Sequence, residues 1–439
     1  MAERIILGGA LLCSADAPLQ LDSGLWIKDG QVAGVGSNEL LRSDHPDAEQ
    51  LDARHLLLMP GLVNAHMHSY GLLAHGFPMH DVPSGFFEFL NEFWWPQVEN
   101  QLDQPMIEAA LRLSCCQMIH SGITSFCDVL EAPNAPDGIL NVEADIARQA
   151  GLRAVLMTEA SERIDVATGL RLLEENAQFV RTNKDNDVIR GMLCLHTSFT
   201  CSRDFIEQAR DMMNDLGCDL HLHLSESAYE PAWCEEHAQM RPAMWYDKVG
   251  LWNGSVLASQ AVDVTDDEID LFVERGVRIA HMPLSNCEVG GGVSPVPKMI
   301  EAGIRPGLGT DGYINNLFEV MRGAFLIHKG VLRNPSVMPA QSVMHMATDW
   351  GAEAIGFDSC GSLSVGMSAD VIGIDLQFDT PLRNENVFDQ LILFRSPGDV
   401  DLSVIGGEVV MERGDLLTLN EEAARADALK QARRLWGEA

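Results

Sequence analysis

Two histidines end an apolar run near the start of the chain. His66 and His68 close the segment 61–68 and stand two residues apart. In a β-strand this spacing points both imidazoles to the same face of the sheet, where they can ligate a divalent metal. An isolated His-x-His also occurs on strands that face solvent, so the pair indicates a site only if further ligands reach the same edge.

Later apolar runs end in the same way, with a residue that can bind a metal or move a proton. These residues are His196, His223, Glu226, Gln260, His281 and Asp311. A buried imidazole without a partner costs about 1–3 kcal/mol, so a shared ligand explains the positions better than unrelated core histidines do. Neutral imidazoles with one carboxylate suit zinc, with iron as an alternative.

Short apolar runs alternate with amphipathic stretches between residues 59 and 355. The runs predict strands at 61–68, 122–128, 152–158, 188–196, 218–224, 255–260, 277–282 and 304–311. Helical patterns lie between them, and Thr265 with Glu268 has the form of a capping box. A strand followed by a helix, repeated along the chain in this number, predicts an α/β fold of the (β/α)₈ TIM-barrel type. Catalytic groups of such barrels lie at the carboxyl ends of the strands.

Both ends of the chain carry short strands and turns instead. The pair Asp29-Gly30 separates two apolar runs, as in a β-hairpin, and a helix is expected over 421–436. A few strands at either end would be marginally stable alone. We therefore predict a small composite β-sandwich domain with a C-terminal helix, built from residues 1–58 and 356–439, beside a catalytic barrel of residues 59–355.

Composition limits the partners. The 439 residues include 30 Lys and Arg against 64 Asp and Glu, a net charge of −34, which argues against nucleic acid or an anionic membrane. No apolar run approaches the ~20 residues of a membrane span, and the N-terminal run is too short for a signal peptide. Ten cysteines without a C-x-x-C motif indicate reduced thiols and a cytoplasmic protein. We also expect a homo-oligomer, a dimer or larger.

Several of these segments resemble the amidohydrolase superfamily. They are 60–68, His223 to Glu226, 281–286 and 308–312, and the segment 361–370 resembles the family's entry into a C-terminal β domain. The similarity covers nearly the whole chain. It is closest to the mononuclear aminohydrolase and chlorohydrolase branch, with relatives among adenosine-type, guanine and triazine hydrolases, and the segment from Gly71 to Trp95 resembles the SsnA-like subset.

The resemblance implies one metal, held by His66, His68, His223 and Asp311. No lysine stands near the end of the fourth strand, where binuclear relatives carry a bridging carbamylated lysine. A metal-bound hydroxide is then expected to attack, with Asp311 and Glu226 as the groups that move protons.

Gln260 departs from the family pattern, because relatives end the sixth strand with a histidine. An amide donates a hydrogen bond but cannot take up a proton near pH 7. Three interpretations remain open: Gln260 orients the reacting groups, another residue (His281, His196 or Asp263) replaces the missing histidine, or hydrolysis is impaired and the protein only binds a ligand.

Aromatic residues follow the first strand and are candidates for a substrate wall. The segment holds Phe86, Phe87, Phe89, Phe93, Trp94 and Trp95, which could equally pack a helix on the barrel or meet a dimer partner. The candidate substrate-binding residues are His196, Trp94, Trp95, Tyr313 and Asn316. Beyond the third strand, adenosyl deaminases place arginines. Here Glu159 and Glu162 stand instead, which favours a neutral or cationic substrate.

The sequence therefore predicts a metal-dependent hydrolase of a non-peptide C–N bond with a small-molecule substrate. The expected reaction is deamination of an amino-substituted N-heterocycle or cyclic amidine. A triazine hydrolase that releases chloride or an alkylamine, an acyclic guanidine or amidine hydrolase, and a metal-containing binding protein are the alternatives.

Overall fold

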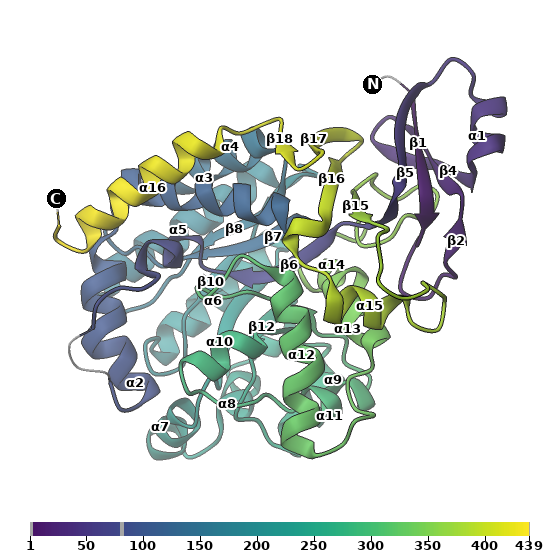
Figure 1. Ribbon diagram of the computed structural model, residues 1–439. Coiled ribbons are helices and arrows are strands. Elements are labelled where there is room, and N and C mark those ends of the chain that lie inside the picture. Colours follow the sequence, from purple (N-terminus) through teal and green to yellow (C-terminus); the bar gives the residue numbers. More distant parts are fainter. Residues whose placement is uncertain (1–2, 80–82, 439) are drawn as a thin grey trace.

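Parallel strands surrounded by helices form the centre of the molecule (Figure 1). The computed structural model describes residues 3–79 and 83–438, so residues 80–82 of the segment between Gly71 and Trp95 lie outside the described residues. The parallel strands form two hydrogen-bonded sheets. The first contains β6 (Leu62–Met67), β7 (Ile123–Leu130), β8 (Arg153–Thr158) and β9 (Ile189–Gly191). The second contains β10 (Leu193–Leu195), β11 (Leu220–Leu224), β12 (Val256–Gln260), β13 (Arg278–His281) and β14 (Gly307–Leu308).

Single parallel bridges link the two sheets at both seams. Met67 pairs with Asp311 at one seam, and Ala160 pairs with Leu195 at the other. At the first seam a Cβ on Gly309 would lie 2.6 Å from the carbonyl oxygen of His66, so this close approach requires glycine. One residue separates β9 from β10, which together occupy the place of the predicted fourth strand. The strands thus follow the predicted (β/α)₈ order.

Helices cover the outside of the strands. They are α3 (Gln104–His120), α4 (Ile139–Ala150), α5 (Val166–Asn183), α6 (Arg203–Leu216), α7 (Tyr229–Ala238), α8 (Pro242–Lys248), α9 (Asp266–Arg275), α10 (Pro283–Glu288), α11 (Val296–Glu301), α12 (Leu317–Leu332), α13 (Ala340–Ala347) and α14 (Asp349–Ala354). The predicted capping box of Thr265 and Glu268 is present at the start of α9. Strands buried on both faces explain why their sequences are almost continuously apolar.

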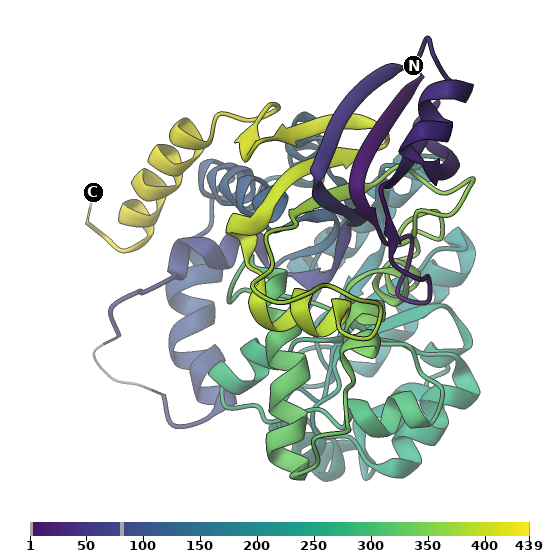
Figure 2. The same ribbon diagram turned by 45° about the vertical axis from the view of Figure 1, so that its right-hand side comes forward.

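Residues from the two ends of the chain form one sheet, shown from a second side in Figure 2. Its N-terminal strands are β1 (Arg4–Leu11), β2 (Gln20–Leu21), β3 (Ser23–Lys28), β4 (Gln31–Ser37) and β5 (Glu49–Pro60), and its C-terminal strands are β15 (Val371–Asp375), β16 (Val400–Ile405), β17 (Glu408–Glu412) and β18 (Asp415–Leu416). The two sets meet where β5 pairs antiparallel with β15. Strands expected as a sandwich are therefore hydrogen-bonded into a single sheet. The predicted hairpin at Asp29-Gly30 joins β3 to β4, and both turn residues have positive φ.

The last helix lies on the barrel rather than on this sheet. In both ribbon views α16 (Glu421–Leu435) runs beside α3. Trp436, directly after it, donates its indole N–H to the carbonyl oxygen of Leu73 at 2.9 Å, and Arg434 pairs with Asp103 at 2.6 Å. The C-terminus thereby supports the loop that follows β6.

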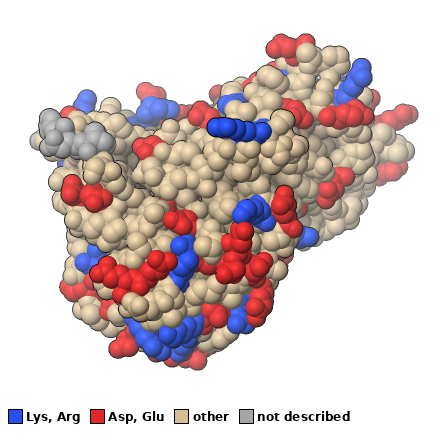
Figure 3. Space-filling view, turned by 90° about the horizontal axis from the view of Figure 1, so that it is seen from below, with Lys and Arg blue, Asp and Glu red and all other residues tan. Residues whose placement is uncertain are grey.

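Acidic side chains are spread over the face shown in Figure 3, with Lys and Arg in smaller groups between them. Within residues 3–79 and 83–438, no helix has the length and apolar character needed to cross a bilayer.

Candidate active site

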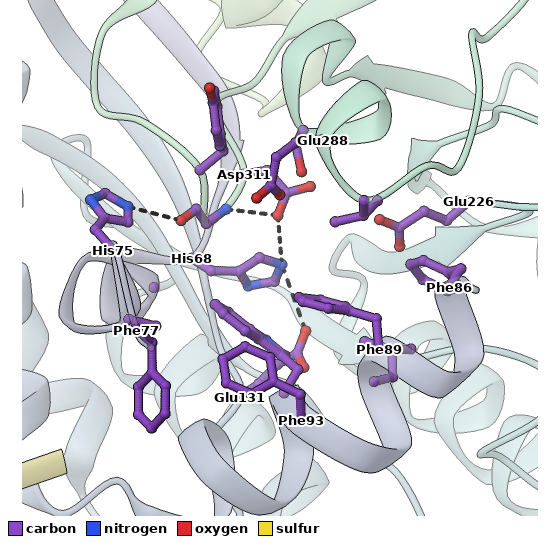
Figure 4. Close-up of a pocket in the computed structure, with 18 of the residues that line it drawn as sticks. His68, His75, Phe77, Phe86, Phe89, Phe93, Glu131, Glu226, Glu288 and Asp311 are labelled. Atoms are coloured by element: carbon purple, nitrogen blue, oxygen red, sulfur yellow. Dashed lines mark hydrogen bonds and ion pairs between the residues drawn. The ribbon is translucent and has the colours of Figure 1, made fainter. Parts of the chain in front are cut away.

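Three imidazoles and one carboxylate converge at the carboxyl ends of the strands, and Figure 4 shows two of these groups, His68 and Asp311, side by side. Ligand atoms of His66, His68 and His223 all lie within 4.8 Å of one another. The Nε2 atoms of His68 and His223 are 3.3 Å apart, and His68 Nε2 is 3.5 Å from Asp311 Oδ1. Metal bonds of ~2 Å from a common centre would place ligand atoms ~3–4 Å apart, as here.

The outer nitrogens of His66 and His68 have partners that leave their inner nitrogens free. His68 Nδ1 lies 2.8 Å from the carbonyl oxygen of Val129, which can only accept, so Nδ1 carries the proton and Nε2 presents a lone pair. His66 Nδ1 lies 3.1 Å from His221 Nε2. Meanwhile His66 Nε2 is buried without a hydrogen-bond partner. An unpartnered buried nitrogen that faces two others fits a bound cation.

Burial keeps His66 and His223 neutral. Loss of solvent, with smaller contributions from neighbouring histidines, lowers the pKa of His66 and of His223 well below the usual value. Neutral imidazole is the form that binds metal. The residues therefore fit a divalent ion with nitrogen and oxygen ligands.

A second group of possible ligands shares His223. Glu159, His196 and His223 also lie close together, with Glu159 Oε2 3.4 Å from His223 Nδ1. His196 Nδ1 already has Thr200 Oγ1 at 2.8 Å. Since His223 Nε2 faces His68, its Nδ1 is the outer nitrogen, and Glu159 Oε2 is the carboxylate oxygen that lies within ion-pair distance of it, without a hydrogen bond between them.

Gln260 lies beside the carboxylate ligand. Its amide nitrogen donates to Asp311 Oδ2 at 2.7 Å, and its amide oxygen accepts a hydrogen bond from Asn286. Because the oxygen is occupied by a donor, the NH₂ group faces Asp311. This hydrogen bond to Asp311 is the contact that the first of the three interpretations requires.

Two of the three residues proposed to replace the missing histidine, His281 and Asp263, are not among the described residues that line the cavity. His281 Nε2 is 3.1 Å from His328 Nε2. Asp263 pairs with Arg241 at 3.0 Å. His196 does line the cavity, close to Glu159.

Backbone strain concentrates at these strand ends. Ser225, Gln260, Ala261 and Asp311 all have positive φ, between 46° and 76°. Non-glycine residues adopt this region at a cost of order 1–3 kcal/mol each, and such residues gather at functional sites. The sequence gives no sign of this strain.

Glu226, predicted from its position after His223, lies in the same cavity as His68, His223 and Asp311. It is partly buried. Burial, and then the charges of Asp311 and Glu230, raise the pKa of Glu226 well above its usual value. A carboxyl group with a raised pKa can hold a proton near neutral pH and pass it on.

The sequence analysis largely missed a group of buried carboxyl side chains near the site. Glu131 directly follows β7, and its Oε1 is 3.6 Å from His68 Nε2. Glu99, in the short helix η3 (Glu99–Gln101), is fully buried and pairs with Arg163 at 2.7 Å. The position of Glu131 at the end of the second strand is the signal that could have identified it, as Glu159 was identified at the third.

The site opens into a cavity of about 370 Å³. Aromatic side chains from α2 (Phe86–Glu88) and the π-helix η2 (Phe89–Val98) form one wall, and α10 and the loop after β14 form the opposite side. Phe86, Phe89, Phe93 and Trp94 line the cavity. The aromatic segment therefore forms a wall, as one of the two interpretations predicted, and it also packs on the barrel through Phe87, which stacks on Tyr229 at 4.2 Å.

Of the other predicted substrate residues, Tyr313 and His196 line the cavity. Trp95 is buried behind the wall, with its ring 5.9 Å from that of His196. Asn316 caps α12 through its side-chain oxygen and is absent from the described lining.

Comparison with known proteins agrees with this geometry. The model of the Amidohydrolase family matches residues 57–410. The chain belongs to the amidohydrolase family. It is 33% identical over 388 residues to a 5-methylthioadenosine/S-adenosylhomocysteine deaminase of Dictyoglomus thermophilum, covering 87% of this chain and 88% of that protein. It is 30% identical over 418 residues to a 5'-deoxyadenosine deaminase of Methanococcus aeolicus, covering 93% and 95%.

Solved structures share the fold. An adenosine deaminase from Xanthomonas campestris with bound zinc aligns over 99% of this chain and 98% of its own, with a TM-score of 0.89 and 24% identity. An atrazine chlorohydrolase from Arthrobacter aurescens, complexed with zinc, aligns over 98% and 100%, with a TM-score of 0.85 and 21% identity.

Proposed function

We propose that this amidohydrolase-family protein hydrolytically deaminates an amino-substituted N-heterocycle or cyclic amidine. The observation that carries the proposal is the convergence of His66, His68, His223 and Asp311 beneath Glu226, at the base of an aromatic-walled cavity. The curated relatives reported above are named as deaminases of adenosine derivatives, which supports the same bond type.

His66, His68, His223 and Asp311 would hold one divalent ion, for which we propose zinc. When bound, such an ion lowers the pKa of a water toward neutrality and so supplies the nucleophile. Asp311 Oδ2 accepts from Gln260, which orients this carboxylate to take a proton from the attacking water. Glu226 then delivers a proton to the leaving nitrogen, so that ammonia departs as a neutral molecule.

Ammonia release from purified full-length protein tests the proposal. The panel comprises aminopurines, adenosine derivatives, pterins, amino- and chlorotriazines, and acyclic guanidines, with metal content measured on the same sample. We expect ammonia from at least one cyclic substrate and about one zinc per chain. Chloride or alkylamine release alone would favour the triazine alternative, and release from acyclic guanidines alone would favour the guanidine hydrolase.

The binding-protein alternative remains because Gln260 replaces a histidine. We propose that Gln260→His changes the rate by about tenfold or less, since Gln260 already donates to Asp311. Hydrolysis that appears only in the variant would show that the natural chain binds a ligand without turning it over.

Two further proposals concern the cellular location and the oligomeric state of the protein. We propose a cytoplasmic protein that forms a homo-oligomer. Cell fractionation and sedimentation velocity of the full chain test them, and a monomer in solution would overturn the second.

A further inference from the structure

The ionisable groups that line the cavity, apart from histidines and Tyr313, are all carboxyl groups. They are Glu131, Glu226, Glu288 and Asp311, supplied by four separate segments, and no Lys or Arg is present among the described lining residues. Arg163 approaches from the loop after β8, but its guanidinium pairs with Glu99 at 2.7 Å and lies over the ring of Trp95 at 4.9 Å. Its charge is therefore already compensated.

Two of these carboxyl groups have no task in the proposed reaction. Asp311 serves as a ligand and Glu226 as a proton donor, whereas Glu131 and Glu288 are left over. Glu288 ends α10 and is exposed at the rim, and Figure 4 shows it beside Asp311, across from the aromatic wall. Glu131 lies deeper, near His68. The carboxylates are therefore distributed along the depth of the cavity.

The opposite side of the cavity suits a flat group. The rings of Phe89 and Trp94 lie 5.6 Å apart with an interplanar angle of 26°, and both line the cavity. Aromatic faces attract planar and cationic groups. Three of the four proposed metal ligands, His68, His223 and Asp311, line the same cavity, so a group bound in it would lie beside the reaction centre.

We propose that the substrate carries a guanidinium-like or amidinium-like group on a flat, apolar frame, with Glu288 as a specificity-determining residue at the rim. This inference rests on the proposed function and names its substrate class. A planar cation donates in-plane hydrogen bonds to carboxylates while its face lies against an aromatic ring. A substrate with a carboxylate tail, by contrast, would find no Lys or Arg among the described lining residues to pair with it.

Binding of three matched probes to the purified, metal-analysed full chain tests the proposal. Phenylguanidine is a flat cation, phenylurea is its neutral counterpart of nearly the same shape, and benzenesulfonate is a flat anion. Isothermal titration calorimetry measures binding without any turnover. We expect phenylguanidine to bind about tenfold more tightly than phenylurea, and benzenesulfonate to bind more weakly than either.

Variants of Glu288 test whether the preference for the cation over the neutral probe arises at the rim of the cavity. Glu288→Gln is expected to reduce the ratio of phenylguanidine to phenylurea affinity about three- to tenfold and to leave phenylurea affinity unchanged. Glu288→Lys should raise the affinity for benzenesulfonate. Glu301→Gln, which removes an exposed carboxylate at the end of α11 outside the lining, is the matched control and should change neither value.

Equal binding of phenylguanidine and phenylurea would overturn the inference, as would an equal change in Glu288→Gln and Glu301→Gln. Failure of the proposed function gives a different result. If the protein prefers phenylguanidine but releases no ammonia from the panel, the inference about the substrate stands and the proposed function is wrong. If the protein deaminates a neutral ring and shows no preference for the cation, the proposed function stands and the inference about the substrate is wrong.

Discussion

Two buried histidine pairs in this protein have similar distances between their Nε2 atoms but different neighbouring residues. His68 and His223 approach through their Nε2 atoms at 3.3 Å, and His281 and His328 approach in the same way at 3.1 Å. The first pair has a third imidazole and the carboxylate of Asp311 beside it. The groups of possible ligands found among the described residues do not include the second pair. Proximity of two imidazoles is therefore not a metal site without further ligands that converge from other strands.

Removal of one of the proposed metal ligands should give the largest loss of metal and of activity, and it tests the pair of His68 and His223. His223→Ala removes one inner nitrogen and is expected to lower metal content from about one ion per chain to near zero, with loss of detectable hydrolysis. Metal analysis after dialysis and the ammonia assay measure this. A variant that keeps its full metal content would show that His223 is not a ligand.

Glu226→Gln separates proton transfer from metal binding. The amide cannot donate the proton, so kcat should fall about 10²- to 10⁴-fold while metal content stays unchanged. Burial and the charge of Asp311 raise the pKa of Glu226, so natural protein should lose kcat as pH rises through that pKa and Glu226 loses its proton. The pH profile of the variant should lack this limb. An unchanged profile would assign the donor to another group.

Glu159→Gln tests whether the outer nitrogen of the first pair needs its carboxylate. Glu159 Oε2 faces His223 Nδ1 at 3.4 Å, and loss of such a contact lowers metal affinity about 10- to 100-fold. Competition with a chelator measures the affinity. Glu162→Gln, which changes a neighbouring carboxylate bonded to the backbone N–H of Ser202, is the control and should have no effect.

His328→Ala tests the second histidine pair, which is expected to stabilise the fold and not to bind a metal. It leaves His281 buried without its partner, so the free energy of unfolding should fall by about 1–3 kcal/mol near pH 7.5. Metal content and kcat should stay at the natural level. Loss of hydrolysis in a variant that folds and binds metal would instead support a catalytic role for His281.

The stability difference between natural protein and His328→Ala should also depend on pH. Burial, and then the charge of Lys329, lower the pKa of His328 from 6.5 to about 4. The unfolded chain therefore binds more protons than the folded one between these values, so the contribution of His328 to stability decreases as pH falls from 6.5 to about 4. Urea unfolding across this range measures the difference, and a difference that does not vary with pH would contradict the placement of a neutral His328.

The strand ends were predictable because a buried parallel strand must be apolar, so a polar residue at its end stands out. His66, His68, His223 and Asp311 were found in this way, and the structure brings them together. The same pattern also selected His281, which ends a strand yet pairs with His328 of α12. Strand position gives the edge of the sheet that a residue reaches, whereas the helix packed outside decides which partner its side chain meets.

Loop residues were predicted less completely. Tyr313 and Trp94 line the cavity, whereas Asn316 caps a helix and Trp95 lies behind the wall. Glu131 and Glu288 carry no motif, and only the fold places them at one cavity. Loop side chains are positioned by contacts between distant segments, which local sequence does not encode.

The amino-acid sequence by itself determined the alternation of strands and helices, the metal-binding residue types at the strand ends and the family, because these depend on local periodicity and chemical type. Only the tertiary structure decided which nitrogen of each imidazole faces the centre, that Gln260 donates a hydrogen bond to Asp311, and that the cavity is lined by acidic and aromatic groups without a Lys or Arg in its described part. These features arise where strands and loops far apart in the chain meet, and the free energy of such contacts exists only once the chain has folded.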